Sequence, residues 1–256
     1  MPDDSPQRYR RHKPTGPNAL AVAGWPHRRG HLFVPIEYQP QYAYPLVVVL
    51  HDTGSDPWEP LAHVPALSSR NYIVVCPRGS LALPSDAFGR PRYAWSDNPT
   101  DEIAYLRRLL EAAYRHFPHL SQSLHVVSIG HSAAVAVRLA VQCQGLPVGL
   151  ILLHPPADSL VQLPASSLWP DLRIFVGYPT WLAPPLSFRR HLTRSLTQAG
   201  VMLQWNAFPY STPYHPEVLR QVNRWIMEAV AVRDNRTVSF SKMVSHRRPV
   251  IPLKQV

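Results

Sequence analysis

The chain has 256 residues, of which 45% are hydrophobic, and a formal net charge of +10. This length and composition predict a folded domain with a substantial core and exclude a wholly disordered chain. No apolar run approaches the about 18 residues that a membrane span needs, and the two isolated cysteines, Cys76 and Cys143, exclude a disulfide framework or a cysteine-rich zinc site. We therefore expect a cytoplasmic protein with no membrane span, metal or cofactor.

Most of the excess positive charge lies near the ends of the chain. Residues 1–30 carry six basic and two acidic residues, and residues 232–256 carry six basic and one acidic residue. We interpret 1–30 as a disordered basic, proline-containing segment, 31–231 as the folded domain, and 232–256 as a disordered basic tail. Because the domain between these segments is almost neutral, specific nucleic-acid binding is not predicted.

The domain alternates segments of strand-like and helix-like pattern. The strand-like segments cover 31–38, 44–51, 71–77, 124–130, 148–153, 172–177 and 201–208. The first is a short alternating run, and those at 44–51, 71–77, 124–130 and 148–153 are the apolar runs typical of strands buried on both faces. Apolar residues at helical spacing occur in 101–116, 132–142, 186–198 and 216–230. This order predicts an α/β fold with a mostly parallel central sheet flanked by helices on both faces. Ligands of such sheets bind beyond the carboxyl ends of the strands, so residues that directly follow strands are the candidate site residues.

A strand that runs directly into small residues and a helix carries the strongest functional signal. Residues 126–134 read VVSIGHSAA, with Gly130 two places before Ser132 and Ala134 two places after it. This is the small-x-Ser-x-small pattern of a nucleophile elbow, which would lift the Ser132 hydroxyl clear of the sheet. The following helix would then favour a developing negative charge. The alternative is an ordinary serine at the start of a helix.

The loop after the first core strand supplies a second signal. It reads LHDTGS at residues 50–55. In a serine hydrolase of this type, one backbone N–H from such a loop and one from the residue after the nucleophile form the oxyanion hole. The candidates are Thr53 and Ala133, and the alternative for the loop is a plain Asp/Gly turn.

With these segments the chain resembles the α/β-hydrolase superfamily, and within it the serine esterases of the phospholipase/carboxylesterase type. The resemblance covers about residues 31–230 and includes YPLVVVLHDTGS, VVCPRGS at 74–80, the elbow, and the closing segment HPEVLRQVNRWIMEAV. It implies an α/β-hydrolase fold without a cofactor. It also implies hydrolysis of carboxylic esters or thioesters through an acyl intermediate on Ser132, with a small acyl ester or another hydrophobic compound as ligand.

The other two members of the family's catalytic triad are missing from their places. Thr180 stands where the resemblance expects Asp, and residues 172–216 contain no Asp or Glu. Thr212 stands at the histidine place, and His215 follows three residues later. The candidate replacements are His215 as a displaced base and Asp158, which follows the strand at 148–153, as an alternative acid.

Two functional hypotheses follow from this pattern. In the first, the protein is a weak or non-standard ester hydrolase that uses Ser132 with His215 and Asp158. In the second, it is a pseudoenzyme that keeps its pocket for a small ligand or a partner protein. A serine without a base is a weak nucleophile. The Asp52 carboxylate lies near the expected oxyanion and would repel it, because both groups are negatively charged. The sequence does not predict the oligomeric state.

Overall fold

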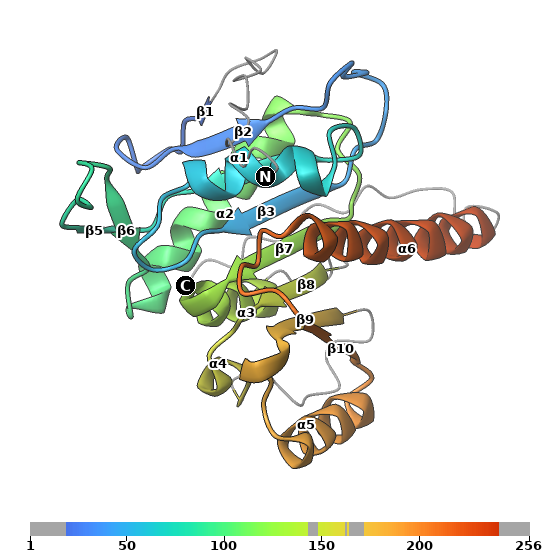
Figure 1. The fold of residues 1–256 in the computed structure, drawn as a ribbon. Helices are drawn as coiled ribbons and strands as arrows, with labels where there is room; N and C mark the ends of the chain where they lie inside the picture. The colour runs from blue at the N-terminus through green and yellow to red at the C-terminus, as the bar shows by residue number, and fades with distance from the viewer. Residues whose placement is uncertain (1–18, 143–147, 162, 164–171, 241–256) are drawn as a thin grey trace, which may run out of the picture.

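The central element of the computed structural model is an eight-stranded sheet; the structure describes residues 19–142, 148–161, 163 and 172–240 (Figure 1). In spatial order the strands are β1 (Ala19–Leu20), β2 (Gly30–Phe33), β4 (Ile73–Pro77), β3 (Leu46–Leu50), β7 (Leu124–Ile129), β8 (Val148–Leu153), β9 (Arg173–Pro179) and β10 (Met202–Phe208). All neighbours from β4 to β10 pair in parallel, whereas β1 and β2 are antiparallel. The predicted mostly parallel sheet is therefore confirmed.

Helices cover both faces of the sheet, as predicted (Figure 1). Buried side chains of α2 (Pro99–His116), α3 (Ala133–Gln142) and α5 (Leu186–Gln198) join one core cluster. Those of α1 (Trp58–Leu67) and α6 (Pro216–Phe240) join the cluster on the opposite face. The remaining elements are a short α4 (Ala157–Val161), single turns at Gly130–Ser132 and Thr180–Leu182, and a separate hairpin of β5 (Leu81–Leu83) and β6 (Arg92–Ala94).

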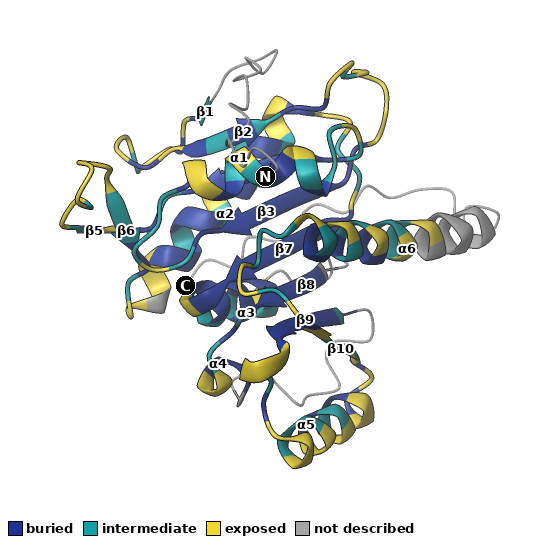
Figure 2. Ribbon diagram, in the orientation of Figure 1, coloured by how far each residue is buried: buried dark blue, intermediate teal, exposed yellow. Residues whose placement is uncertain are grey.

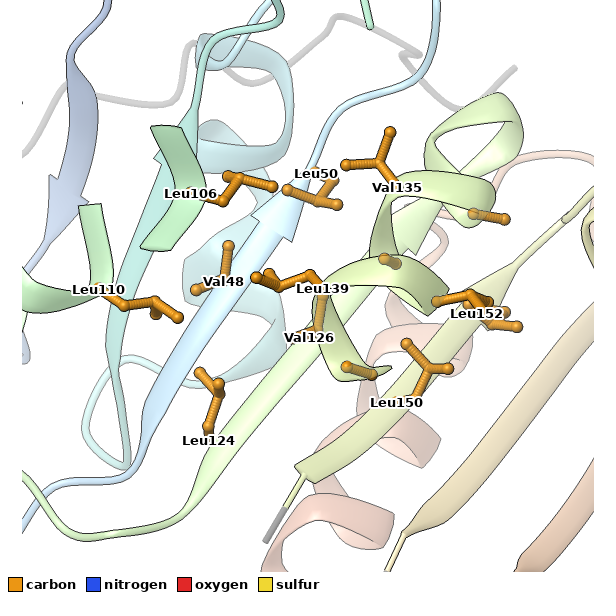
Figure 3. Close-up of a cluster of buried hydrophobic side chains, with 14 of the residues drawn as sticks. Val48, Leu50, Leu106, Leu110, Leu124, Val126, Val135, Leu139, Leu150 and Leu152 are labelled. Atoms are coloured by element: carbon orange, nitrogen blue, oxygen red, sulfur yellow. The ribbon is translucent and has the colours of Figure 1, made fainter. Parts of the chain in front are cut away.

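The core depends on strands that are buried on both faces. Every residue of β3, β4 and β7 is buried, which explains why these segments are continuous apolar runs (Figure 2). Val48 and Leu50 of β3 pack with Leu139 of α3 on one face (Figure 3), while Val47 and Val49 face the α1 and α6 layer. This packing fixes the carboxyl ends of the strands, where the candidate site residues lie.

The amino-terminal edge of the domain differs from the prediction. Within the segment predicted to be disordered, residues 19–30 belong to the fold, because β1 pairs with β2 and Arg28 is buried. The Arg28 guanidinium forms a 2.5 Å ion pair with Glu102 of α2 and lies over the ring of Tyr105. It also donates to the carbonyl of Arg78 at 2.9 Å. The domain thus begins earlier than predicted, and residues 1–18 lie outside the described residues.

Two helical features also differ from the prediction. Helix α6 continues to Phe240, so the first part of the predicted 232–256 tail is helical, and residues 241–256 lie outside the described residues. Helix α1 was not predicted. It contains Pro65 in its interior, and proline within a helix removes a hydrogen-bond donor and clashes with the preceding turn. The packing of Val64 and Leu67 into the core opposes that cost.

Three further predictions concern membrane spans, metal sites and cysteines. None of the described helices is long and apolar enough to cross a membrane. Within the described ranges, no group of three or more His, Cys, Asp or Glu side chains is placed to hold a metal ion. Cys76 is a buried free thiol whose pKa is raised by burial, and Cys143 lies outside the described residues.

The buried pair between Arg28 and Glu102 predicts a large effect on stability. Arg28→Met leaves the fully buried Glu102 carboxylate without its cation, and we expect a loss of about 3–5 kcal/mol in the free energy of unfolding. In the double variant Arg28→Met/Glu102→Gln no uncompensated charge remains, so part of the loss is recovered. Urea denaturation of the wild type and both variants measures this, and equal losses in both variants would contradict the expectation.

Candidate active site

The candidate site lies where the parallel strands end. Asp52 follows β3, Gly130 follows β7, His154 follows β8 and Thr180 follows β9. The loop of residues 209–215 joins β10 to α6. These residues come from distant parts of the sequence, and the parallel register of the strands brings their carboxyl ends to one edge of the sheet.

The turn after β7 has Gly130 at its apex. This residue adopts φ +58°, a left-handed conformation that glycine adopts without steric cost. A β-carbon added here would collide with the Asp52 carboxylate. The chain then continues through a single turn at Gly130–Ser132 into α3. The apex of the turn is therefore a glycine packed directly against a carboxylate.

Ser132 lies inside this turn, and its side chain is fully buried. Its hydroxyl lies 2.9 Å from the carbonyl oxygen of Ile129 and 3.1 Å from that of Leu50, and it accepts the N–H of Ile129 at 3.0 Å. The expectation that the turn exposes the Ser132 hydroxyl is wrong, because these bonds hold it against the ends of β7 and β3. Its contacts match those of a structural serine at a helix start.

The Asp52 carboxylate accepts two converging backbone N–H groups. Its Oδ1 lies 2.7 Å from the nitrogen of Thr53 and 2.8 Å from that of His131. The exposed imidazole of His131 lies 3.2 Å from the same oxygen. Ala133 had been predicted to supply one of these N–H groups, but its N–H donates to the carbonyl of Gly130 within the turn. Converging N–H groups form an anion site, and here the anion belongs to the protein itself.

His51, at the end of β3, holds the loop that carries Asp52. Its Nδ1 lies 2.7 Å from the carbonyl oxygen of Asp52, and its Nε2 accepts the N–H of Gly79 at 3.0 Å. Because a carbonyl only accepts and a backbone N–H only donates, the imidazole is neutral with its proton on Nδ1. Burial lowers the pKa of His51 below its ordinary value of 6.5, which keeps it in this form.

The two candidate replacements, His215 and Asp158, make local contacts. Nδ1 of His215 accepts the N–H of Glu217 at 3.2 Å at the start of α6, and its ring stacks on Tyr210. Asp158 is exposed in the first turn of α4 and accepts the N–H of Ser159 at 2.8 Å. Among the described residues, no hydrogen bond or ion pair joins either side chain to the predicted nucleophile. The structure therefore shows no assembled triad of these residues.

The two threonines at the triad places also make backbone contacts. The hydroxyl of Thr180 donates to the carbonyl of Phe208 at 2.9 Å, which links the ends of β9 and β10. The hydroxyl of Thr212 accepts the N–H of Tyr214 at 3.2 Å within the loop. Both side chains thus stabilise the local backbone.

Two further residues lie near Asp52, and the sequence assigned neither of them a catalytic role. His154 has φ +55°, and its Nε2 is buried with no hydrogen-bond partner among the residues that the structure describes. Burial lowers the pKa of His154, and the charge of Asp52 opposes that shift. Tyr214 stacks on His63, and burial raises the pKa of its unpartnered hydroxyl, with nearby Glu59 adding to the effect. Only their positions after strands could have indicated them, because neither belongs to a motif.

Two hollows in the described part of the chain lie away from the strand ends. One, of about 420 Å³, lies between α2 and α3 and is lined by Arg107 and Arg138. The other, of about 640 Å³, lies between α5 and β10. Neither is lined by Asp52, Gly130 or Ser132. These hollows therefore do not support the prediction that the protein keeps a pocket at the candidate active site.

Comparison with known proteins supports the fold and gives no closer relationship. No protein-family model matches the chain, and no curated protein sequence matches it.

Solved structures match most of the chain at low sequence identity. A carboxylesterase from Bacillus cereus is 16% identical with a TM-score of 0.54, covering 79% of this chain and 95% of that one. A carboxylesterase from Mesorhizobium loti is 16% identical with a TM-score of 0.57, covering 80% and 98%. Esterase PE8 is 15% identical with a TM-score of 0.56, covering 78% and 98%. The chain therefore has the α/β-hydrolase fold that the sequence predicted.

The contact between Gly130 and Asp52 predicts that their mutations interact. Gly130→Ala places a β-carbon at φ +58° and against the carboxylate, and we expect a loss of at least about 2 kcal/mol in the free energy of unfolding. Asp52→Ala removes the obstacle, so Gly130→Ala should cost about 1 kcal/mol less in that background. Chemical denaturation of the double-mutant cycle measures the difference. Strictly additive losses would show that the two groups do not meet.

The neutral state of His51 predicts a pH-dependent stability. The folded state holds the pKa of His51 below 6.5, so the unfolded state takes up a proton first as the pH falls, and stability decreases below about pH 6.5. His51→Gln keeps one donor and one acceptor but cannot titrate. Between pH 6.5 and 5, we expect its unfolding free energy to depend less steeply on pH, by up to about 1.4 kcal/mol per pH unit.

The exposed His119 provides the matched control for this measurement. His119→Gln should show the wild-type slope of unfolding free energy against pH. If His51→Gln also keeps the wild-type slope, the neutral imidazole is not a source of the pH dependence.

Proposed function

We propose that this chain is a carboxylesterase-type member of the α/β-hydrolase superfamily whose hydrolytic site is closed, so that it acts as a pseudoenzyme. The observation that carries this proposal is the Asp52 carboxylate, which accepts the N–H groups of Thr53 and His131. The solved esterases with the same fold support the superfamily, although their identity of 15–16% supports no particular substrate.

Gly130 takes the place of the nucleophile in this proposal. In a nucleophile elbow, the residue after the nucleophile supplies one N–H of the oxyanion hole. The N–H that converges with that of Thr53 comes from His131, and this supports Gly130, not Ser132, as the nucleophile position. Ser128 and Ser132 are then the small residues two places before and after it. Glycine has no side chain, so no acyl intermediate can form at this position.

The oxyanion hole is also unfavourable for a substrate. A tetrahedral intermediate of ester hydrolysis carries its negative charge at the point where the two N–H groups meet. The Asp52 carboxylate already accepts both N–H groups, and its negative charge would repel the developing oxyanion. The same site therefore lacks a nucleophile and presents the wrong charge.

The alternative is a weak ester or thioester hydrolase that uses Ser132. For this, the Ser132 hydroxyl would leave the carbonyl oxygens of Leu50 and Ile129, and His215 would leave its contact with Glu217 to act as base. Both rearrangements break hydrogen bonds before any chemistry begins, and the alternative is therefore less favoured than the pseudoenzyme.

A fluorophosphonate probe separates the two functions, because it labels activated serines. We expect the wild type to show neither labelling nor turnover of p-nitrophenyl esters above the level of Ser132→Ala. An active carboxylesterase in the same assay serves as the positive control, and circular dichroism confirms that both samples are folded. Labelling or turnover that disappears in Ser132→Ala would overturn the proposed loss of activity.

A further inference from the structure

Helix α5 presents a strip of arginines along the β10 edge of the sheet. Arg189, Arg190 and Arg194 line the hollow of about 640 Å³ together with Leu186 and Trp205. In Figure 1, α5 lies beside β10 at the end of the sheet, away from α1 and α6. The hollow is therefore an outer surface of the domain, separate from the candidate active site.

The positive charge of this strip is not neutralised within its own part of the chain. Residues 172–216 contain four arginines and no Asp or Glu. Among the described residues, none of the three arginines lining the hollow forms an ion pair, and the Nε of Arg189 is buried without a partner. Arg190 and Arg194 are one helical turn apart, where like charges repel. An anionic partner would remove this repulsion.

Exposed apolar side chains lie at the start of the same helix. Trp181 and Leu182 are each 61% exposed in the turn before α5, and Leu186 is 52% exposed in its first turn. These are three of the nine large hydrophobic residues that are exposed in the described part of the chain, so apolar surface gathers at this end of α5.

The wall of the hollow is held in place by a short chain of hydrogen bonds. The indole N–H of Trp205 donates to the hydroxyl of Thr193 at 2.9 Å, and this hydroxyl lies 2.8 Å from the carbonyl oxygen of Arg189. These contacts fix β10 against the middle of α5. The 13-residue helix spans about 20 Å. Leu186 and the arginines line the same hollow, so charged and apolar side chains lie next to each other on this helix.

We propose that this strip docks the protein on the surface of an anionic phospholipid membrane. Guanidinium groups form planar, bidentate hydrogen bonds with phosphate oxygens, so the arginines can bind the lipid headgroups. Tryptophan and the neighbouring leucines can insert into the interfacial layer below the headgroups. The net charge of +10 adds long-range attraction to the anionic lipids of a cytoplasmic membrane surface. The proposal is independent of whether Ser132 hydrolyses esters.

The apolar residues favour a lipid surface over a soluble phosphate compound. A free phosphate would contact the arginines alone and leave Trp181, Leu182 and Leu186 exposed to water. A membrane takes up both kinds of side chain at once, because its phosphates lie directly above its hydrocarbon layer.

Vesicle co-sedimentation of the full chain tests the proposal. We expect binding to phosphatidylcholine vesicles that contain about 30% phosphatidylserine, and little binding to phosphatidylcholine alone. Arg190→Gln/Arg194→Gln should weaken partitioning by about 30-fold. Trp181→Ser/Leu182→Ser should weaken it without changing the net charge, and this loss should persist at high salt, where the arginine contribution is screened.

The matched control is Arg115→Gln/Arg224→Gln, which removes two exposed arginines from α2 and α6 and lowers the charge equally. We expect this variant to bind at least tenfold more tightly than the α5 variant. Equal losses in both would show adsorption through net charge only and would overturn the proposal. So would displacement of the protein from vesicles by millimolar glycerol phosphate, or arginine-dependent binding of a single-stranded oligonucleotide without binding to vesicles.

Discussion

The carboxylate of Asp52 is the interaction on which the arrangement of the candidate site depends. It accepts the N–H groups of Thr53 and His131 and lies where a side chain at Gly130 would project. Neutral His51 holds the backbone of the same loop through the carbonyl of Asp52. The ends of β3 and β7 are thus joined through a charge-assisted contact, and the two donors that would stabilise an oxyanion already have an acceptor. The same carboxylate therefore accepts both N–H groups and links the two strand ends.

Ser132 shows how one sequence pattern serves two purposes. Its hydroxyl is buried between the ends of β3 and β7 and contacts the backbone of both Leu50 and Ile129. A buried hydroxyl in this position stabilises the turn because the backbone groups around it would otherwise lack partners. The turn can keep the shape of a nucleophile elbow while Ser132 acts as a structural residue.

The strands were largely predictable, because a fully buried parallel strand is an unbroken apolar run, and β8 was predicted to the residue. The site was less predictable. The segment Ser128–Ser132 fits the small-x-x-x-small pattern two residues earlier than the pattern centred on Ser132. The φ of Gly130 and the contact of the His131 N–H with Asp52 distinguish the two. The place of Arg28 in the core was not predictable either, because its partner Glu102 lies 74 residues away. The pattern of apolar residues predicts which strands are buried. The backbone conformation of a turn and an ion pair between residues far apart in the sequence are determined by the tertiary structure.

The absence of Asp and Glu from residues 172–216 has physical consequences at two places in this segment. At the end of β9 it leaves Thr180, which donates to a backbone carbonyl and cannot orient a histidine as a carboxylate does. Along α5, Arg190 and Arg194 form no ion pair with any residue in the described part of the chain. A serine hydrolase with a catalytic triad requires an acid at the end of β9. On α5, the lack of nearby acids leaves the arginines free to attract anions. The composition of this segment therefore affects both the candidate site and the surface of α5, because it supplies a carboxylate to neither.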